Sequence, residues 1–539
     1  MQYIKYHRLL LCLYVVIIPI AALASVYFSL CLNPVINIIY DPDKSAFVKA
    51  SVILVMFGLL DIITHYIQSL SVERLRRYYL AGLKRDLYCH YSNYSYKEFC
   101  ENPSANYLSV ITRDADMMCS SMFDSYCGIY KTIVCFTINF VFIIRIGLWI
   151  ALINVIMGLL SIIIPKILDR PVIRNQDEAS KQSKQFYTML SDRLNGFAVL
   201  KTFRSFKSAR VQIEDESNKM ERANYQSSMA NYSVSYICML VSEIAFALTI
   251  IIGVWLAING KMAVGMVFTV SQLAGGILVP IEQMPRYIVN LRSIKKVKER
   301  IDNVLRHQDE YISYPEADIN SMNRISVDNL SFAYDNDLII NDVNICLDLR
   351  KKYFLTGESG CGKSTFAKLL TGLYLPSSGK IWYSDKYNTE NISENSLYKK
   401  VSYVEQNTFI FCDTVRNNIT LFHDYTDEEI VKALKEANLY EVVNSLPEGL
   451  DTVLTNNGGI LSGGERQRIG IARALITGAE FLILDEVTAN LDQRTRESIE
   501  NTLLSLDGKG FLMVSHNISA NAKAHAEYVL KMENGKIAC

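Results

Sequence analysis

The sequence predicts a multidomain protein in which an all-α domain of six membrane-spanning helices precedes an α/β domain that carries a phosphate-binding loop. Hydrophobic residues make up 50% of the 539, and the long apolar runs lie before about residue 285. Charged, turn-rich sequence follows and contains the glycine-rich stretch GESGCGKST, from Gly357 to Thr365. Because a single core rarely grows to this length, at least two domains are expected.

Six apolar stretches are long enough to cross the roughly 30 Å core of a bilayer, which takes about 20 helical residues. Only Arg145 separates the third from the fourth, and Asn259–Lys261 separate the fifth from the sixth, so both pairs are predicted to be tight hairpins. The stretches run about Leu9 to Leu32, Ala46 to Leu70, Ser125 to Ile144, Ile146 to Pro165, Tyr236 to Ile258 and Met262 to Ile281.

The segments after the second and fourth spans are long and rich in Lys and Arg, as in ERLRRYYLAGLKR from Glu73 to Arg85. The positive-inside rule places these segments and both chain ends in the cytoplasm. Helix-compatible sequence continues into them, so the helices are expected to project past the bilayer. Turns are predicted near Glu101–Ser104 and Asn195–Gly196.

A polar, aperiodic stretch, HQDEYISYPEADINSMN, marks the boundary between the two domains. We therefore expect a transmembrane domain at 1–305, a linker at 306–324 and a nucleotide-binding domain at 325–539. In the second domain ISVDNLSFAY alternates like a strand, KKYFLTG runs into the glycine loop, and FLILDE is a short apolar strand. Buried strands flanked by helical sequence predict a mainly parallel sheet.

Charge and cysteine content exclude some partners. The formal net charge is zero and no long Lys/Arg run is interleaved with aromatic residues, so a nucleic-acid partner is not expected. The 12 cysteines include no CxxC pair and no Cys/His ligand spacing. This usage indicates a reducing, cytosolic setting for the second domain.

The glycine-rich stretch fits the phosphate-loop pattern GxxxxGK[S/T], between a predicted strand and a predicted helix. Its glycines let backbone N–H groups converge on phosphates, Lys363 supplies a positive charge to the β and γ oxygens, and the Ser364 hydroxyl binds Mg²⁺. The residues expected to contact the nucleotide here are Gly357, Glu358, Ser359, Gly360, Cys361, Gly362, Lys363, Ser364 and Thr365.

A second element, FLILDE from Phe481 to Glu486, delivers two carboxylates at the end of an apolar strand. Asp485 is expected to hold the Mg²⁺ shell. Glu486 is expected to act as the general base on the attacking water, because phosphoryl transfer depends mainly on positioning and charge stabilisation.

Between these elements lies LSGGERQR, from Leu461 to Arg468, which resembles the signature of ATP-binding cassette (ABC) proteins. Further parts of that family's pattern follow in order. Tyr334 matches the aromatic residue on which adenine stacks, Gln406 matches the glutamine loop, Ala489–Asp492 match the D-loop, and His516 matches the switch histidine.

The resemblance implies an ABC half-transporter of the exporter type, with a P-loop NTPase cassette after the six helices. It implies ATP and Mg²⁺ as cofactors, with Ser364, Gln406 and Asp485 around the metal. It implies catalytic roles for Lys363, Gln406, Glu486 and His516. The signature residues Ser462, Gly463, Gly464 and Glu465 would contact ATP held by another cassette. A dimer with a second copy, or with a homologous half-transporter, is therefore expected.

In that family, coupling helices that press on the cassette fall where this chain has Glu101–Ser104 and Asp192–Gly196. The expected function is ATP-driven export of a peptide, a lipid or a hydrophobic small molecule across the plasma (inner) membrane, with the cassette in the cytoplasm. Two alternatives stay open: an importer built on the exporter fold, for a metal chelate or a peptide, and an ATP-gated channel or sensor. Six spans argue against a soluble ABC ATPase.

Asp61 in the second span and Glu243 in the fifth are acidic groups where a charge costs about 2.5 to 3.5 kcal/mol near mid-bilayer. Each is expected to face protein or water. The sequence leaves open whether they contact a substrate or make hydrogen bonds between helices.

Overall fold

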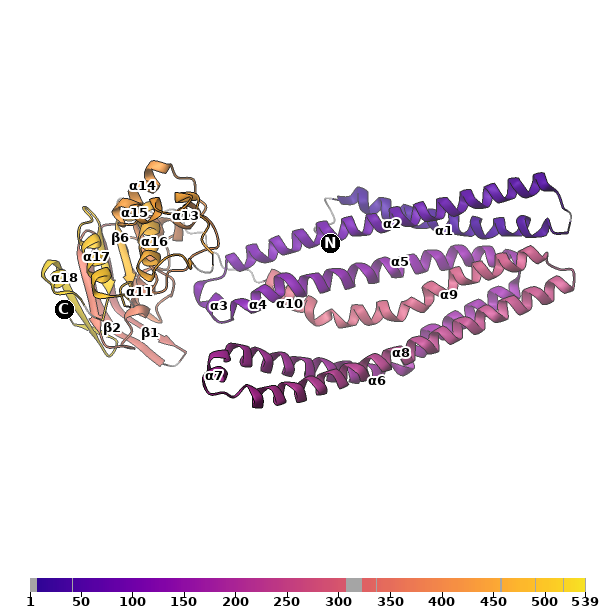
Figure 1. Ribbon diagram of the computed structural model, residues 1–539, viewed down its shortest axis with the longest axis horizontal. Coiled ribbons are helices and arrows are strands. Elements are labelled where there is room, and N and C mark those ends of the chain that lie inside the picture. The colour runs from indigo at the N-terminus through magenta and orange to yellow at the C-terminus, as the bar shows by residue number, and fades with distance from the viewer. Residues whose placement is uncertain are drawn as a thin grey trace. The chain divides into compact units, whose positions relative to one another are not determined.

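The computed structural model describes residues 7–40, 42–306, 322–335, 337–455, 458–489, 491–516 and 518–538. They divide into two units, whose residues can be traced by colour in Figure 1. The helical unit comprises Met1–Ser92 and Pro103–Gln308, and the cassette unit comprises Asn93–Asn102 and Asp309–Cys539. Within the proposed linker 306–324, residues 307–321 lie outside the described residues.

Six helices of the described helical unit are long and apolar enough to span a membrane, which confirms the predicted six spans. The longest, α8, has 53 residues, or about 80 Å at 1.5 Å per residue, well beyond a 30 Å core. The helices are α1 (Arg8–Asn37), α2 (Lys44–Ser92), α4 (Ser104–Ser109), the π-helical turn η2 (Val110–Asp114), α5 (Ala115–Ile146), α6 (Leu148–Asn195), α7 (Phe197–Thr202), α8 (Phe206–Ile258), α9 (Val264–Ser293) and α10 (Lys295–Arg306).

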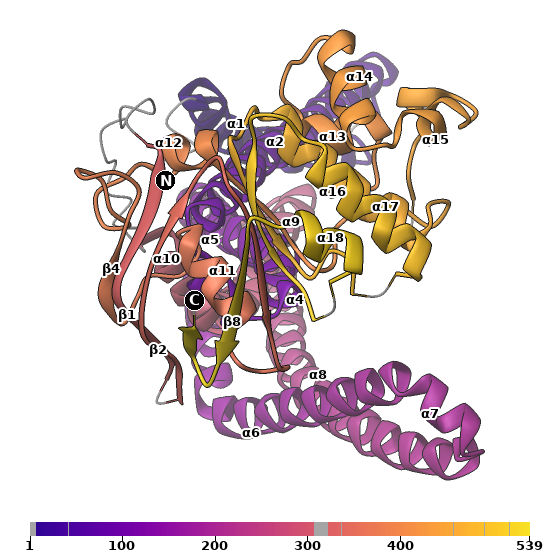
Figure 2. The ribbon, with the colours of Figure 1, turned by 90° about the vertical axis from the view of Figure 1, so that its left-hand side faces the viewer.

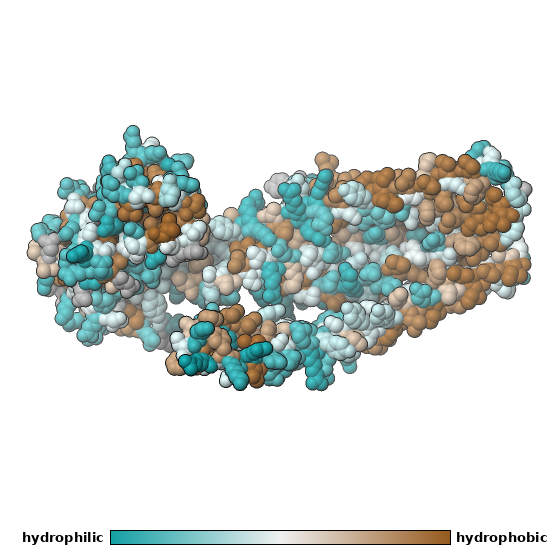
Figure 3. All heavy atoms as spheres, viewed as in Figure 1, coloured by the Kyte–Doolittle hydropathy of each residue, from teal (hydrophilic) through white to brown (hydrophobic). Residues whose placement is uncertain are grey.

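Apolar residues gather on the half of the helical unit that carries the α1–α2 and α8–α9 turns, as Figure 3 shows. The other half is largely polar on the face that Figure 3 presents. A long helix that is apolar at one end and polar at the other fits a membrane span continued into water. The chain is a multi-pass membrane protein.

The turns follow the sequence with one correction. The chain leaves helical geometry at 101–103 and at Gly196, as predicted. The third and fourth spans separate at Gly147, however, and the prediction that Arg145 separates them is wrong by two residues. Arg145 lies in the last turn of α5, where a cation is stabilised by the carbonyls at a helix C-terminus.

Hydrogen bonds between helices help to hold the spans together. Asn154 Nδ2 on α6 donates to Thr249 Oγ1 on α8 at 3.1 Å, and Thr269 Oγ1 on α9 donates to the Ser29 carbonyl on α1 at 2.9 Å. Such bonds stabilise packing where the solvent is as apolar as the side chains. An apolar cluster from α1, α5, α6 and α9 adds to this packing, and its buried members include Val26, Ile143, Ile150, Leu273 and Ile277.

The two acids of the membrane spans, Asp61 and Glu243, differ in their burial. Asp61 Oδ1 is buried, makes no hydrogen bond to any described residue, and lies 3.7 Å from Nε2 of His65 on the same helix. Glu243 is exposed in the single chain.

The cassette unit contains two sheets, and the mainly parallel sheet predicted from sequence is the larger. Its six strands lie in the order β5-β6-β7-β3-β8-β9, and all neighbours are parallel except β8 and β9. Every residue of the central strands β6 and β7 is buried, which fits their unbroken apolar sequence. The strands are β3 (Lys352–Gly357), β5 (Val401–Val404), β6 (Phe481–Asp485), β7 (Gly510–Val514), β8 (Tyr528–Glu533) and β9 (Lys536–Ala538).

A second, antiparallel sheet, in the order β2-β1-β4, was not predicted. It comprises β1 (Arg324–Tyr334), β2 (Asp337–Asp348) and β4 (Ser378–Trp382). In Figure 2 these strands lie on one side of the cassette unit and helices α13 to α17 on the other.

The helices of the cassette unit are α3 (Tyr96–Cys100), α11 (Lys363–Leu370), α12 (Glu394–Lys400), α13 (Val415–Thr420), α14 (Asp427–Glu436), α15 (Tyr440–Asn444), η4 (Gly449–Asp451), α16 (Gly463–Ile476), α17 (Gln493–Leu504) and α18 (Ala520–His525).

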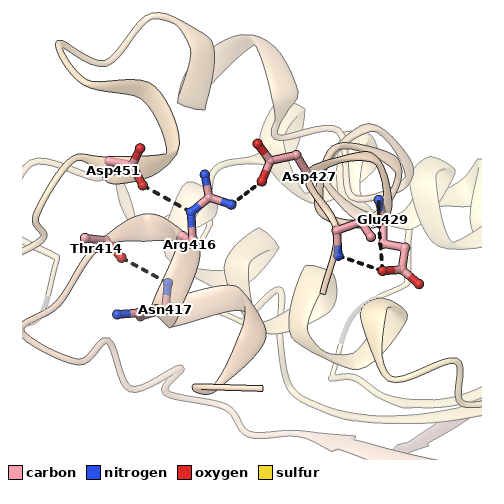
Figure 4. Close-up of polar contacts among 7 residues, drawn as sticks. Thr414, Arg416, Asn417, Asp427, Glu429 and Asp451 are labelled. Carbon is pink, nitrogen blue, oxygen red and sulfur yellow. Dashed lines mark hydrogen bonds and ion pairs between the residues drawn. The ribbon is translucent and has the colours of Figure 1, made fainter. Parts of the chain in front are cut away.

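Arg416 joins three short helical elements of the cassette (Figure 4). From α13 its guanidinium contacts Asp427 at the start of α14, and its Nε donates to Asp451 of η4 at 3.1 Å. Caps fix the starts of the same helices: the hydroxyl of Thr414 accepts from the Asn417 amide, and Glu429 accepts from the Thr426 amide.

Candidate nucleotide-binding site

The phosphate loop joins β3 to α11 with a backbone that glycine alone adopts easily. Gly360 and Gly362 have φ values of +81° and +103°. A Cβ on Gly362 would lie 2.9 Å from Ile340 Cδ1, and one on Gly357 would lie 2.4 Å from the Met532 carbonyl oxygen. The loop therefore keeps its backbone bare at the N-terminus of α11, where N–H groups bind phosphate.

Lys363 is folded against this loop. Its side chain is buried, and Nζ donates to the carbonyl oxygens of Gly357 and Glu358 at 3.0 and 2.7 Å. These carbonyls hold the ammonium at the loop, within reach of a phosphate group bound by the loop amides.

Asp485, at the end of β6, is held by two hydroxyl groups. Ser364 Oγ donates to Oδ1 at 2.8 Å, and the Tyr403 hydroxyl donates to Oδ2 at 3.0 Å. Burial raises the pKa of Asp485 above its ordinary value, while the hydrogen bonds from Ser364 and Tyr403 oppose that rise. A hydroxyl beside a carboxylate suits Mg²⁺, which prefers oxygen ligands, so these residues fit the metal that the sequence implies.

Glu486 meets two of the other residues singled out from the sequence. Gln406 Nε2 donates to Glu486 Oε2 at 2.9 Å, and His516 Nε2 lies 2.9 Å from Oε1. Glu486 has a φ of +49°, a strained value for a residue with a side chain and one that concentrates at functional sites. This backbone turn follows directly on β6.

The topology explains why these groups converge. Gln406, Glu486 and His516 follow β5, β6 and β7, and the phosphate loop follows β3. The four strands are parallel and adjacent, so their carboxyl ends share one edge of the sheet, where ligands bind in such folds. Of the three expected Mg²⁺ residues, the structure joins Ser364 to Asp485 and places Gln406 on Glu486.

Tyr334, the expected adenine platform, is part of an aromatic cluster beside the loop. Its hydroxyl lies 3.5 Å from Thr365 Oγ1, and its ring packs edge-on against Tyr374 at 5.6 Å. Tyr96 of α3 packs on the other side of this cluster, 5.6 Å from Tyr374, and Lys368 Nζ lies 5.3 Å from the Tyr96 ring. Thus α3, in the segment between α2 and α4 that we call the first elbow, is separated from Tyr334 by one ring, that of Tyr374.

The signature residues begin α16. Ser462 and Glu465 form a capping box: the Ser462 amide donates to Glu465 Oε2 at 2.7 Å, and the Glu465 amide donates to Ser462 Oγ at 3.3 Å. Gly463 lines a cavity of about 300 Å³ together with Gln406, Gln467 and Glu486. Within the described residues, that cavity is lined by no member of the phosphate loop. The signature turn therefore borders Gln406 and Glu486 of its own chain but not its phosphate loop.

Tyr403 was not among the predicted site residues, and the short helices α3 and α7 flank the predicted turns. Tyr403 lies in the stretch SYVEQN, three residues before Gln406, and the signal that could have found it is a hydroxyl near the end of the strand that leads to the glutamine loop. The short helices lie beside the predicted elbows: α3 ends just before Glu101–Ser104, and α7 begins just after Asp192–Gly196.

Comparison with known families agrees with this geometry. The profile of the ABC transporter transmembrane region matches residues 11–281, and that of the ABC transporter domain matches residues 340–489. The chain is an ABC transporter. It is a half-transporter of the exporter type, with the membrane region before the ATP-binding domain.

Among its relatives, the ATP-dependent lipid A-core flippase of Haemophilus ducreyi (strain 35000HP) is 28% identical over 94% of this chain and 88% of its own. The microcin-J25 export ATP-binding/permease protein McjD of Escherichia coli is 30% identical over 65% of this chain and 60% of its own. A solved bacterial Atm1-family ABC exporter with ATP bound has a TM-score of 0.83 at 19% identity, covering 99% of this chain and 94% of that one. This structural similarity shows that the two chains share a fold.

Proposed function

We propose that this half-transporter works as a homodimer that hydrolyses ATP to export a peptide, a lipid or a hydrophobic small molecule. The observation that carries the proposal is the convergence of Gln406, Glu486 and His516 at the sheet edge that also bears the phosphate loop. A carboxylate held there by two partners is suited to take a proton from an attacking water.

The remaining groups stabilise charge. Lys363 and the loop amides face the phosphates, where negative charge is spread in the transition state. Ser364 and Asp485 hold Mg²⁺, which supplies positive charge to phosphate oxygens. Tyr334 receives the adenine ring. In this scheme Glu486 is the catalytic base, while Gln406 and His516 hold its carboxylate.

A second copy completes the site. The capping box engages the side chains of Ser462 and Glu465 at the start of α16, while the amides of Gly463 and Gly464 occupy the first turn, where a helix binds anions. We infer that this turn contacts ATP held by the phosphate loop of the other copy. A homologous half-transporter is the alternative partner.

Two exposed apolar surfaces support the same assembly. The α7 tip (Phe197, Val199 and Phe203) leaves Phe203 77% exposed. On the cassette, the aromatic surface (Phe409, Phe411 and Phe422) is a chain of exposed rings at centroid distances of 5.1 and 6.0 Å. We propose that the α7 tip of one copy packs on the aromatic surface of the other, so that closure of the cassettes moves the membrane helices.

The proposed location is the plasma (inner) membrane, with the cassette and both chain ends in the cytoplasm. Lys and Arg in the polar ends of the long helices support this orientation. Export as the direction is supported by relatives whose names describe a flippase and a microcin exporter.

Reconstituted vesicles with the cassette outward test the proposal. Peptides, lipids and hydrophobic compounds are screened for stimulation of ATP hydrolysis, and stimulating compounds are then tested for ATP-dependent accumulation inside the vesicles. We expect accumulation with the natural chain and none with Glu486→Gln. ATP-dependent release of preloaded compound would indicate an importer, and ion conductance without hydrolysis would indicate a channel.

A further inference from the structure

Tyr403 contacts the proposed metal site and lies three residues before Gln406, in the stretch SYVEQN, but was given no role from the sequence. We propose that it is a positioning residue for Mg²⁺: its hydroxyl fixes the carboxylate of Asp485 in the orientation that the metal requires. This inference rests on the proposed ATPase function and names a residue that the function does not assign.

The two oxygens of Asp485 are held from different elements. Ser364 on α11 donates to Oδ1, and Tyr403 on β5 donates to Oδ2. The terminal torsion of an aspartate is broad and leaves its carboxylate free to turn. One donor fixes one oxygen, whereas donors on both oxygens fix the plane of the group. Of these two donors, only Tyr403 is not itself a proposed metal ligand.

The end of β5 orders both acids of the site. Tyr403 donates to Asp485, and Gln406, three residues later, donates to Glu486. Strand β5 pairs directly with β6, which carries the acids, and Tyr403 lies opposite Ile483 in that ladder. The distance between the hydroxyl and the carboxylate is therefore set by the sheet.

The burial of Asp485 makes the hydrogen bond from Tyr403 important for the position of its carboxylate. Asp485 is 3% exposed, so few of its hydrogen bonds can come from solvent. The Tyr403 ring packs against one of the two apolar cores of the cassette, which holds the hydroxyl in place. Groups that orient a metal ligand typically change metal affinity by about 10- to 100-fold when they are lost.

The test measures metal binding separately from hydrolysis. Full-length protein in detergent is mixed with less than one equivalent of ADP, and Mn²⁺ is titrated while free Mn²⁺ is followed by electron paramagnetic resonance. For Tyr403→Phe, which keeps the ring, we expect the affinity for Mn²⁺ to fall about tenfold. The affinity for ADP in EDTA should stay unchanged. Tyr403→Leu, which removes ring and hydroxyl, should show the same loss of metal affinity.

Tyr383→Phe is the matched control, because it removes another buried hydroxyl bond, from Tyr383 to the Leu370 carbonyl, away from Asp485. It should leave Mn²⁺ affinity unchanged. Unchanged Mn²⁺ affinity in Tyr403→Phe, or an equal loss of ADP affinity with and without metal, would overturn the inference. If the natural chain binds ADP but no Mn²⁺, the proposed ATPase function fails instead.

Discussion

The proposed nucleotide site has two halves that differ in how far one chain completes them. The sheet-edge half (Lys363, Gln406, Asp485, Glu486 and His516) lies at one edge of the sheet, and hydrogen bonds within the chain join its two acids to their neighbours. The signature half (Ser462–Glu465) is joined mainly to itself by a capping box. The contrast fits the proposal that the sheet-edge residues act within one chain, whereas the signature turn, whose cavity includes no residue of the phosphate loop among the described residues, acts on nucleotide held by a partner.

The largest effect is expected at the sheet-edge half. Glu486→Gln removes the proposed base and should lower the turnover number for ATP by about 10²- to 10⁴-fold, while ATP binding persists. A steady-state ATPase assay and a nucleotide-binding titration measure the two quantities. Glu428→Gln, an exposed acid on α14, is the control and should act like the natural chain. Full turnover by Glu486→Gln would remove Glu486 from its role.

The next effect is expected at the signature half. Gly463→Asp should cost about a hundredfold in turnover, because a carboxylate would face the phosphates of the partner's ATP. Its fold should survive: the new Cβ would lie 3.6 Å from Leu491 Cδ2, and an acid suits the first turn of a helix. Thermal unfolding checks the fold. An active Gly463→Asp variant would show that this turn meets no phosphate.

A smaller effect is expected where the membrane helices meet the partner. Phe203→Ser removes the most exposed ring of the α7 tip and should weaken the dimer at least tenfold, since burying a phenylalanine contributes about 1.5 to 3 kcal/mol and about 1.4 kcal/mol is tenfold. Mass photometry over a dilution series measures this change. Phe422→Ser should match it, and Tyr187→Ser, at an exposed position on α6, should not. Equal dimer stability in all four proteins would contradict the proposed contact.

The first elbow should matter less. Tyr96→Ala removes the ring that supports Tyr374 and, through it, Tyr334, so affinity for ATP should fall about threefold, as expected for one aromatic pair. Tyr96→Phe keeps the ring and should bind ATP as the natural chain does. Fluorescent-nucleotide titration distinguishes them. Unchanged affinity in Tyr96→Ala would separate α3 from the adenine platform.

The smallest effect lies outside both halves. Arg416→Gln breaks the pairs with Asp427 and Asp451 and should lower the free energy of unfolding of the cassette by less than about 1 kcal/mol, because such partly exposed pairs contribute little. ATP turnover should not change. Chemical denaturation of the purified protein measures the first quantity. A loss of several kcal/mol would contradict this ranking and make the Arg416 cluster a main support of the cassette fold.

The parts of the molecule that the sequence revealed are those specified by neighbouring residues. The phosphate loop, the FLILDE strand and the six spans each depend on a short pattern or an apolar run, and each lies where it was predicted. Asp485 and Glu486 could be placed at a strand end for the same reason.

The parts that the sequence hid depend on contacts between distant segments. Tyr403 touches an acid 82 positions away, and Tyr96 of the first elbow packs on Tyr374 in the cassette. The antiparallel sheet pairs β1 with β4, which lie before and after the phosphate loop in the sequence. No local pattern encodes these pairings, so residue spacing could not reveal them.

Mixed dimers test most directly whether each site is shared between two copies. Two differently tagged chains are co-expressed, the mixed species is purified through both tags, and ATP turnover is measured. With Lys363→Ala on one chain and Gly463→Asp on the other, a shared arrangement leaves one intact site and predicts up to half of the natural turnover. With both changes on one chain beside a natural partner, it predicts almost none. The reverse pattern, or full turnover by isolated single chains, would contradict the account.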